Sequence, residues 1–280
     1  MEQTPSGVEI IRPWQGFDLR CALFDFDGTI SLIREGWQGI MIPYFTEVLQ
    51  AAAPGEDPEA AETCVRDFVD TLTGKQTIFQ CIRLDEEVQK RGGPARDPLT
   101  YKREYLRRLE ERIHSRKEAL AQGRAKPEDY LVPGAGAFLA LLRESGIRCY
   151  LASGTDEEDV LREARLLGLE GLFAGGIHGA HDGMTDCSKE LVIRDMLERE
   201  HILPKQLVSF GDGYVEVELV ARLGGLAVGA ATNEETRQGI NEWKRRRLVE
   251  AGANAIIPDF REGTAILEAI RRDCYAVSTV

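Results

Sequence analysis

The sequence has few features of a membrane, secreted or nucleic-acid-binding protein. No apolar stretch in its 280 residues reaches the length of a transmembrane helix, because charged residues interrupt every candidate. Met1 to Gln15 lacks a basic region followed by an apolar one, so we expect no secretory signal. Basic residues are in deficit, and the formal net charge is −12. This deficit argues against nucleic acids and anionic membranes as partners, since both attract basic surfaces.

Cysteine pairs at short spacing are also absent. The six cysteines are scattered, and no CxxC pattern occurs among them. Scattered cysteines in apolar segments behave as small hydrophobic residues, and we therefore expect a reducing, cytoplasmic location. With 43% hydrophobic and 29% charged residues, the composition is that of an ordinary globular protein. Its length suits one large domain, or a core with an inserted second domain.

The second half of the chain alternates strand and helix patterns. Residues 1–18 are expected to be irregular, because Pro5 and Pro13 oppose regular structure. Strands are predicted at 21–24, 148–152, 172–177, 207–210, 226–230 and 255–257. Helices are predicted at 137–144, 156–167, 189–200, 215–223 and 264–271. Such alternation predicts an α/β fold with a parallel sheet covered by helices on both faces.

The region after the first strand has a helical pattern throughout. In its last helix Tyr101, Tyr105, Leu109 and Ile113 recur every four residues, which places them on one face. A structureless connection of this length is implausible in a compact domain. We therefore predict an α/β core of residues 1–30 and 128–280, with a helical domain of residues 31–127 inserted into it.

Two carboxylates follow the first predicted strand. The apolar run from Cys21 to Phe24 ends in Asp25 and Asp27, and a Gly-Thr turn comes next. Open α/β sheets bind ligands at the carboxyl ends of their strands. There, one acid can attack a phosphorus atom while the other manages the proton. Taken alone, however, Asp-Gly is also a common surface-turn sequence.

Polar residues follow the next predicted strand as well. Ser153 supplies a hydroxyl, and Gly154 and its neighbours supply backbone N–H groups, to an anion at a helix N-terminus. Thr155 and Glu158 have the spacing of a capping box. The alternative is that Ser153 and Thr155 only cap the helix.

Three further charged residues lie at the ends of later elements. Lys189, at a helix start, can neutralise a phosphate oxygen or a nucleophilic carboxylate. Asp212, between two glycines at a strand end, can reach a cation held by Asp25. Glu216 is placed to hold a metal-bound water or Lys189. Solvated positions on helix surfaces are the alternatives for Lys189 and Glu216.

The order of these groups (two Asp, then Ser, Lys and Asp) resembles the four motifs of the haloacid dehalogenase (HAD) superfamily. The resemblance covers residues 19–30 and about 130–260, and it implies a Rossmann-like core. It also implies that Asp25 is the nucleophile, which forms an aspartyl-phosphate, and that Asp27 acts as acid and then as base. By the same resemblance, Mg2+ is held by Asp25, the backbone carbonyl of Asp27, and Asp212.

The resemblance further implies a phosphate site and a cap. Ser153, the amide of Gly154 and Lys189 correspond to the phosphate-binding groups. The inserted helices resemble the family's small helical cap, in which Lys75 is a candidate substrate contact or an exposed loop lysine. Dehalogenases lack an acid at the position of Asp27, and phosphatases and phosphomutases have one. The third motif lacks the Lys-Pro pair of many phosphosugar and phosphoglycolate enzymes.

We therefore expect a Mg2+-dependent phosphatase that acts on a small phosphorylated metabolite of the phosphosugar or polyol phosphate class. A phosphomutase and a non-catalytic phosphometabolite sensor are the alternatives. The expected partner is that metabolite, with no nucleic acid and no membrane, and the protein is expected to be a monomer or homodimer.

Other conspicuous residues are interpreted without a catalytic role. The pair His178 and His181, beside Asp182, is expected in a loop at the sheet edge rather than at a metal. Trp37 is expected to pack within the cap or to shape a pocket. The basic run Lys244–Arg247 is expected on a solvated helix face.

Overall fold

The computed structural model describes residues 7–181 and 189–274. The chain forms two compact units, the first from residues up to Glu35 and from Leu120 onward, the second from Gly36 to Ala119. Within the described residues, no helix combines the length and apolar character needed to cross a membrane.

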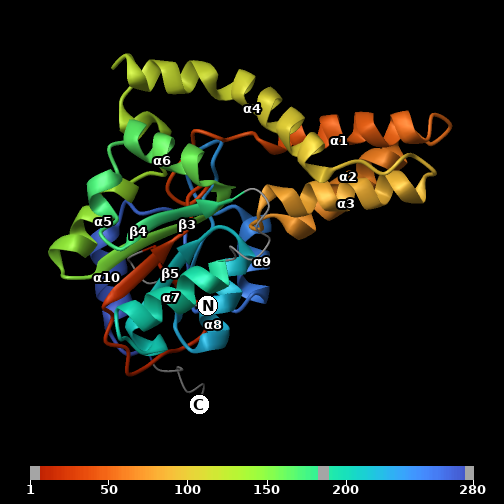
Figure 1. The fold of residues 1–280 in the computed structure, drawn as a ribbon. Helices are drawn as coiled ribbons and strands as arrows, with labels where there is room; N and C mark the ends of the chain where they lie inside the picture. The colour runs from red at the N-terminus through yellow and green to blue at the C-terminus, as the bar shows by residue number, and fades with distance from the viewer. Residues whose placement is uncertain (1–6, 182–188, 275–280) are drawn as a thin grey trace. The chain divides into compact units, whose positions relative to one another are not determined.

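The first unit contains a seven-stranded sheet in the order β1-β7-β6-β5-β2-β3-β4. Figure 1 labels β3, β4 and β5 of this sheet. Its strands are β1 (Glu9–Ile10), β2 (Cys21–Phe24), β3 (Arg148–Asp156), β4 (Gly176–Ala180), β5 (Leu207–Gly211), β6 (Leu226–Ala230) and β7 (Ala255–Ile257). All neighbouring pairs are parallel except β1 with β7. The helices of this unit are α5 (Ala135–Glu144), α6 (Glu157–Leu166), α7 (Lys189–Arg199), α8 (Tyr214–Leu223), α9 (Glu242–Glu250) and α10 (Gly263–Arg271). The predicted α/β fold class is confirmed.

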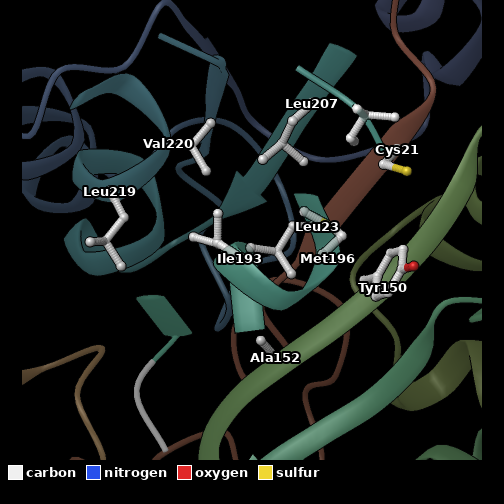
Figure 2. Packing of buried hydrophobic residues seen from close by; sticks show 10 residues of the cluster. Cys21, Leu23, Tyr150, Ala152, Ile193, Met196, Leu207, Leu219 and Val220 are labelled. Carbon is white, nitrogen blue, oxygen red and sulfur yellow. The ribbon is translucent and has the colours of Figure 1, made fainter. Parts of the chain in front are cut away.

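Strand β2 lies between β5 and β3 in the interior of the sheet, and its side chains are buried on both faces. On one face, Cys21 and Leu23 belong to an apolar cluster that also includes Ile193 of α7 and Leu219 of α8 (Figure 2). On the other face, Phe24 stacks on Phe210 of β5, with 4.8 Å between the ring centroids. An apolar strand with no polar face is the expected occupant of such a position.

Aromatic rings fill the second face of the sheet. Phe138 of α5 lies 5.2 Å from Phe260 and 5.3 Å from Phe210, measured between ring centroids. Offset and edge-to-face pairs of this kind add to the stabilisation from burial alone. The cluster anchors the carboxyl ends of β2 and β5, because Phe24 is the last residue of β2 and Phe210 the last but one of β5.

The structure corrects two predicted elements of the core. The strand predicted at 172–177 lies later, at Gly176–Ala180, and a 3-10 helix ends at Leu172. Phe173 belongs to no strand. It is buried beside Phe24, with 6.3 Å between the ring centroids, and this contact accounts for an apolar residue at this position. The leader, predicted irregular, contains β1, which pairs with β7.

The second unit is helical. Its helices are α1 (Gln38–Ala52), α2 (Pro58–Leu72), α3 (Thr77–Lys90) and most of α4 (Pro98–Ala121). The first three pack on one another, and the rings of Phe45 and Phe68 stack 6.0 Å apart. The face of α4 predicted from its four-residue repeat is buried, from Tyr101 to Ile113. The interpretation of residues 31–127 as a substrate-selecting cap stays a prediction.

Candidate functional site

The loop after β2 places Asp25 and Asp27 at the carboxyl edge of the sheet. The amide of Asp25 continues the sheet by donating to the carbonyl of Phe210 over 3.0 Å. The chain then turns at Gly28, whose φ is +77°. A Cβ atom on Gly28 would lie 2.3 Å from Oδ2 of Asp212, so only glycine allows the loops after β2 and β5 to approach this closely.

Asp25 is buried and bonded to a lysine. The Nζ atom of Lys189, the first residue of α7, donates to Oδ1 of Asp25 over 2.8 Å and to Oε2 of Glu216 over 2.6 Å. All three side chains are almost inaccessible to solvent. The solvated alternatives for Lys189 and Glu216 are therefore wrong, and both residues join the predicted cluster.

Burial and neighbouring charges shift the pKa values of this cluster. Burial raises the pKa of Asp25; the charge of Lys189 opposes the increase, and the negative charge of Asp212 adds to it. Burial also raises the pKa of Glu216 to about 7, against the charge of Lys189. For Lys189, burial acts to lower the pKa, but the charges of Asp25 and Glu216 outweigh it and raise the pKa above its ordinary value.

Asp27 lies in a separate environment. Its Oδ2 atom accepts a hydrogen bond of 2.7 Å from the hydroxyl of Thr155, and its Oδ1 atom lies 3.9 Å from Nε of Arg34. Burial raises the pKa of Asp27 to about 7, although the charge of Arg34 and the hydrogen bond from Thr155 both lower it. A carboxyl group with a pKa near neutrality can both donate and accept a proton.

Arg34 is held by carboxylates of α6. It donates to Glu163, which is fully buried, over 2.8 Å, and to Asp159 over 2.9 Å. Sequence reasoning missed Arg34 and Glu163. The only signal was an arginine directly after the apolar pair Leu32 and Ile33, seven residues after Asp27.

The end of β3 differs from its predicted form. The strand runs on to Asp156, which is the N-cap of α6, so the predicted capping box of Thr155 and Glu158 is wrong. Thr155 instead contacts Asp27. The hydroxyl of Ser153 accepts the amide of Thr155 over 3.0 Å, and Gly154 lies between them at an irregularity in the sheet register. Ser153 and Gly154 therefore lie on the strand beside β2.

Asp212 is held from two sides. The hydroxyl of Thr29 donates to Oδ1 of Asp212 over 3.2 Å and accepts the amide of Asp212 over 2.8 Å. The ammonium group of Lys244 lies 2.6 Å from Oδ2 of Asp212 and 2.5 Å from Oε1 of Glu234. Lys244 is buried, so its predicted place on a solvated helix face is wrong.

The charges of these groups fit one divalent cation. When all four carboxylates are ionised, they exceed the two ammonium groups by two negative charges; the groups are Asp25, Asp212, Glu216, Glu234, Lys189 and Lys244. Mg2+ is bound by oxygen ligands, often one or two carboxylates together with waters. In the described part of the chain, no group of three or more His, Cys, Asp or Glu side chains is arranged as a metal site. The set expected here has two carboxylates and one carbonyl.

The structure places the other residues singled out in the sequence as follows. Lys75 is exposed in the loop between α2 and α3, and Trp37 is the N-cap of α1. His178 belongs to β4 rather than to a loop. His181 lies 3.4 Å from Glu157. Asp182, named above beside the histidines, lies outside the described residues.

Comparison with known proteins gives a family match over most of the chain. The family model for hydrolases described as haloacid dehalogenase-like matches residues 19–224. No match was found among curated proteins.

Several solved structures share the fold. A predicted phosphoglycolate phosphatase from Haemophilus somnus is 16% identical, with a TM-score of 0.58, over 90% of this chain and 97% of that one. CbbY from Rhodobacter sphaeroides, solved with phosphate, is 19% identical, with a TM-score of 0.55, over 88% and 96%. A candidate β-phosphoglucomutase from Thermotoga maritima is 18% identical, with a TM-score of 0.51, over 90% and 99%. At these identities the likeness establishes the fold.

Proposed function

Because this chain belongs to the haloacid dehalogenase-like hydrolases, we propose that it is a Mg2+-dependent phosphatase. Its substrate would be a small phosphate monoester, hydrolysed through an aspartyl-phosphate on Asp25. Phosphoryl transfer needs positioning and charge neutralisation above all, and the cluster around Asp25 supplies charged groups of both signs in a buried place.

The observation that carries this proposal is the different environment of the two aspartates. Asp25 accepts a hydrogen bond from the ammonium group of Lys189, which opposes the rise in its pKa on burial and so favours its ionised, nucleophilic form. Asp27 has a hydroxyl partner and a pKa raised to about 7, which suits a proton carrier. Pairs of carboxyl groups in contrasting environments are the usual basis for dividing nucleophilic and acid–base roles.

In the first step, a carboxylate oxygen of Asp25 forms a bond to phosphorus while the bond from phosphorus to the ester oxygen breaks. Asp27 gives its proton to that leaving oxygen. In the second step, Asp27 takes a proton from water, and the water oxygen bonds to phosphorus. The bond between phosphorus and Asp25 then breaks, which releases inorganic phosphate and restores both carboxyl groups to their starting states.

The remaining groups are proposed to bind the phosphate group and the Mg2+ ion. Lys189 holds Asp25 in place and faces the phosphate oxygens, and the hydroxyl of Ser153 and the amide of Gly154 are the proposed further phosphate contacts. Asp25, the carbonyl of Asp27, and Asp212 are the proposed ligands of Mg2+. When bound, Mg2+ supplies positive charge that stabilises the transferring phosphoryl group.

For the substrate we propose a phosphosugar or polyol phosphate, with Lys75 of the helical unit as a candidate contact. Names given to structural neighbours, a phosphoglycolate phosphatase and a β-phosphoglucomutase, support small phosphorylated metabolites as the class. A phosphomutase remains the second candidate, because it uses the same nucleophile and acid. A sensor without catalysis is disfavoured, since binding alone does not require a proton carrier such as Asp27.

Phosphate release tests the proposal directly. The purified protein is incubated with phosphorylated sugars, polyols, glycolate and nucleotides, with Mg2+ or with EDTA. We expect metal-dependent release from one chemical group of substrates, and none from the Asp25→Asn variant, whose folding is checked by circular dichroism. Isomerisation of a sugar phosphate that depends on a sugar bisphosphate, with little phosphate release, would instead identify a mutase. Turnover by Asp25→Asn would remove Asp25 as the nucleophile.

A further inference from the structure

Lys244 is the one residue of the basic run Lys244–Arg247 that is buried. It lies in the first turn of α9, where the amides of Trp243 and Lys244 donate to the side chain of Asn241, the N-cap residue. A cation in the first turn of a helix opposes the helix dipole, and burial adds a desolvation cost. The carboxylates of Asp212 and Glu234, which both contact Nζ of Lys244, offset these two costs.

The two carboxylates belong to different loops. Asp212 follows β5, and Glu234 follows β6, so the ammonium group joins the ends of neighbouring strands. Gly28 lies against the same pair: a Cβ there would come within 2.3 Å of Asp212 Oδ2 and 3.0 Å of Glu234 Oε1. The loops that contain Gly28, Asp212 and Glu234 therefore meet here, and the ammonium group of Lys244 lies between the two carboxylates.

We propose that Lys244 is a built-in cation that prevents Asp212 and Glu234 from jointly binding a divalent metal ion. In this way Lys244 keeps Asp212 available for the ion that it shares with Asp25. The inference rests on the proposed function, in which Asp212 is a ligand of Mg2+. Lys244 is a positioning residue: it acts on the metal through Asp212 and touches no substrate.

The charge balance supports this role. With Lys244 in place and all four carboxylates ionised, the cluster of four carboxylates and two ammonium groups has two excess negative charges, which one divalent ion would neutralise. Without Lys244 the same cluster has three excess negative charges. The carboxylates of Asp212 and Glu234 then have no ammonium group between them. Oxygen ligands of this kind attract hard divalent ions, so the vacated position becomes a competing site.

The same balance predicts opposite effects for the two partners of Asp212. Lys244→Met removes a positive charge. Mn2+, used as a spectroscopic probe, should then bind about tenfold more tightly, or two Mn2+ ions should bind per chain. Glu234→Gln leaves the ammonium group to Asp212 alone, and Mn2+ binding should weaken by roughly tenfold. A role limited to holding the fold together would weaken binding in both variants.

Electron paramagnetic resonance of Mn2+ titrated into the purified protein measures affinity and stoichiometry without relying on catalysis. The matched control is Arg246→Met, which removes an exposed cation two residues from Lys244 on the same helix and should leave both values unchanged. At saturating Mg2+, kcat of Lys244→Met should fall, because the carboxylate of Asp212 then binds an ion together with Glu234 and no longer serves only the ion shared with Asp25. Tighter binding together with slower turnover is the distinguishing result.

The outcomes separate this inference from the proposed function. If the wild-type protein binds no Mn2+, or if Asp212→Asn binds it as well as wild type, the metal site itself is wrong. If wild type binds one ion that Asp212→Asn loses, but Lys244→Met binds it equally or more weakly, only the role of Lys244 is overturned. Should Lys244→Met not fold, unchanged or tighter binding by Glu234→Gln overturns that role in the same way.

Discussion

The hydroxyl of Thr155 at the end of β3 donates to Oδ2 of Asp27, across 2.7 Å, and so joins two strand ends that are 128 residues apart in the sequence. This bond orients the carboxyl group that we propose as the proton carrier. The opposite oxygen of Asp27 is buried and has no hydrogen-bond partner among the residues that the structure describes, although Arg34 lies 3.9 Å from it. Thr155 is therefore the one direct hydrogen-bond donor to the Asp27 carboxyl group among the described side chains.

Replacing Thr155 with valine should slow turnover roughly tenfold, because a hydrogen bond to a charged group is lost at nearly constant volume. The bond from Thr155 lowers the pKa of Asp27, so its loss should raise that pKa. The limb of the pH–rate profile that reports Asp27 should accordingly move to higher pH. Thr155→Ser, which keeps the hydroxyl, is the control. An unchanged profile in Thr155→Val would show that Thr155 does not act on Asp27.

Replacing Asp27 with asparagine should lower kcat by about two to four orders of magnitude, because general acid–base catalysis is lost. Mn2+ affinity should stay within a few-fold of wild type, since the proposed ligand at this residue is the backbone carbonyl. Measuring kcat and Mn2+ binding on the same preparation separates the two roles. Loss of metal binding in Asp27→Asn would contradict the assignment.

The same variant makes a prediction about stability. The pKa of Asp27 is raised from 3.8 to about 7 in the folded protein, so between these values the native state holds a proton that the unfolded chain releases. The free energy of unfolding of the metal-free wild type should thus fall as the pH rises from about 4 to 7. Asp27→Asn does not titrate, and above pH 7 it should be more stable than wild type, by on the order of 2 kcal/mol. Urea unfolding at pH 5 and pH 8 checks the sign.

Replacing Arg34 with methionine should destabilise the protein by about 3 kcal/mol, because the fully buried Glu163 then loses its cationic partner. A double variant with Glu163→Gln should recover part of the loss. The control is Arg162→Met on the same helix as Glu163: Arg162 is exposed and paired with Asp159, and its replacement should cost less than about 1 kcal/mol. Equal losses for Arg34→Met and Arg162→Met in chemical denaturation would be inconsistent with a buried ion pair.

Replacing Gly211 with alanine should disturb the cluster of Lys189, Asp25 and Glu216 without replacing any charged residue. A Cβ at this position would lie 1.7 Å from Oε1 of Glu216, so Glu216 must move and Lys189 loses one of its two acceptors. We expect a loss of stability of about 1–3 kcal/mol and a fall in kcat of roughly a hundredfold. Gly171→Ala, where a Cβ meets nothing within 4 Å, is the matched control for thermal unfolding and kinetics.

The core architecture could be predicted because its signals are local. Strand β2 is a short apolar run that ends in Asp25, and its neighbours alternate with helices that have clear apolar faces. The strand misplaced at 172–177 shows the limit of this reasoning. Phe173 is apolar for a tertiary reason, its contact with Phe24, and periodicity cannot distinguish such a residue from a strand residue.

Site residues were predictable where residue type and position near a strand end coincide. Asp25, Lys189 and Glu216 were expected near one another, and the structure brings them together through hydrogen bonds of 2.8 and 2.6 Å. Thr155 and Lys244 were misinterpreted as a helix cap and a solvated lysine. Both residue types are common in those surface roles, and nothing adjacent in the sequence indicates their buried partners.

The sequence by itself determined the parallel α/β core, the carboxylates at the end of its first strand, and the class of chemistry that those groups suit. These follow from apolar periodicity and from residue types at neighbouring positions. Only the tertiary structure decided which oxygen each cation contacts. Arg34 pairs with Glu163 across 129 residues and Lys244 with Asp212 across 32, and the burial that makes these charges matter exists only once the chain has folded.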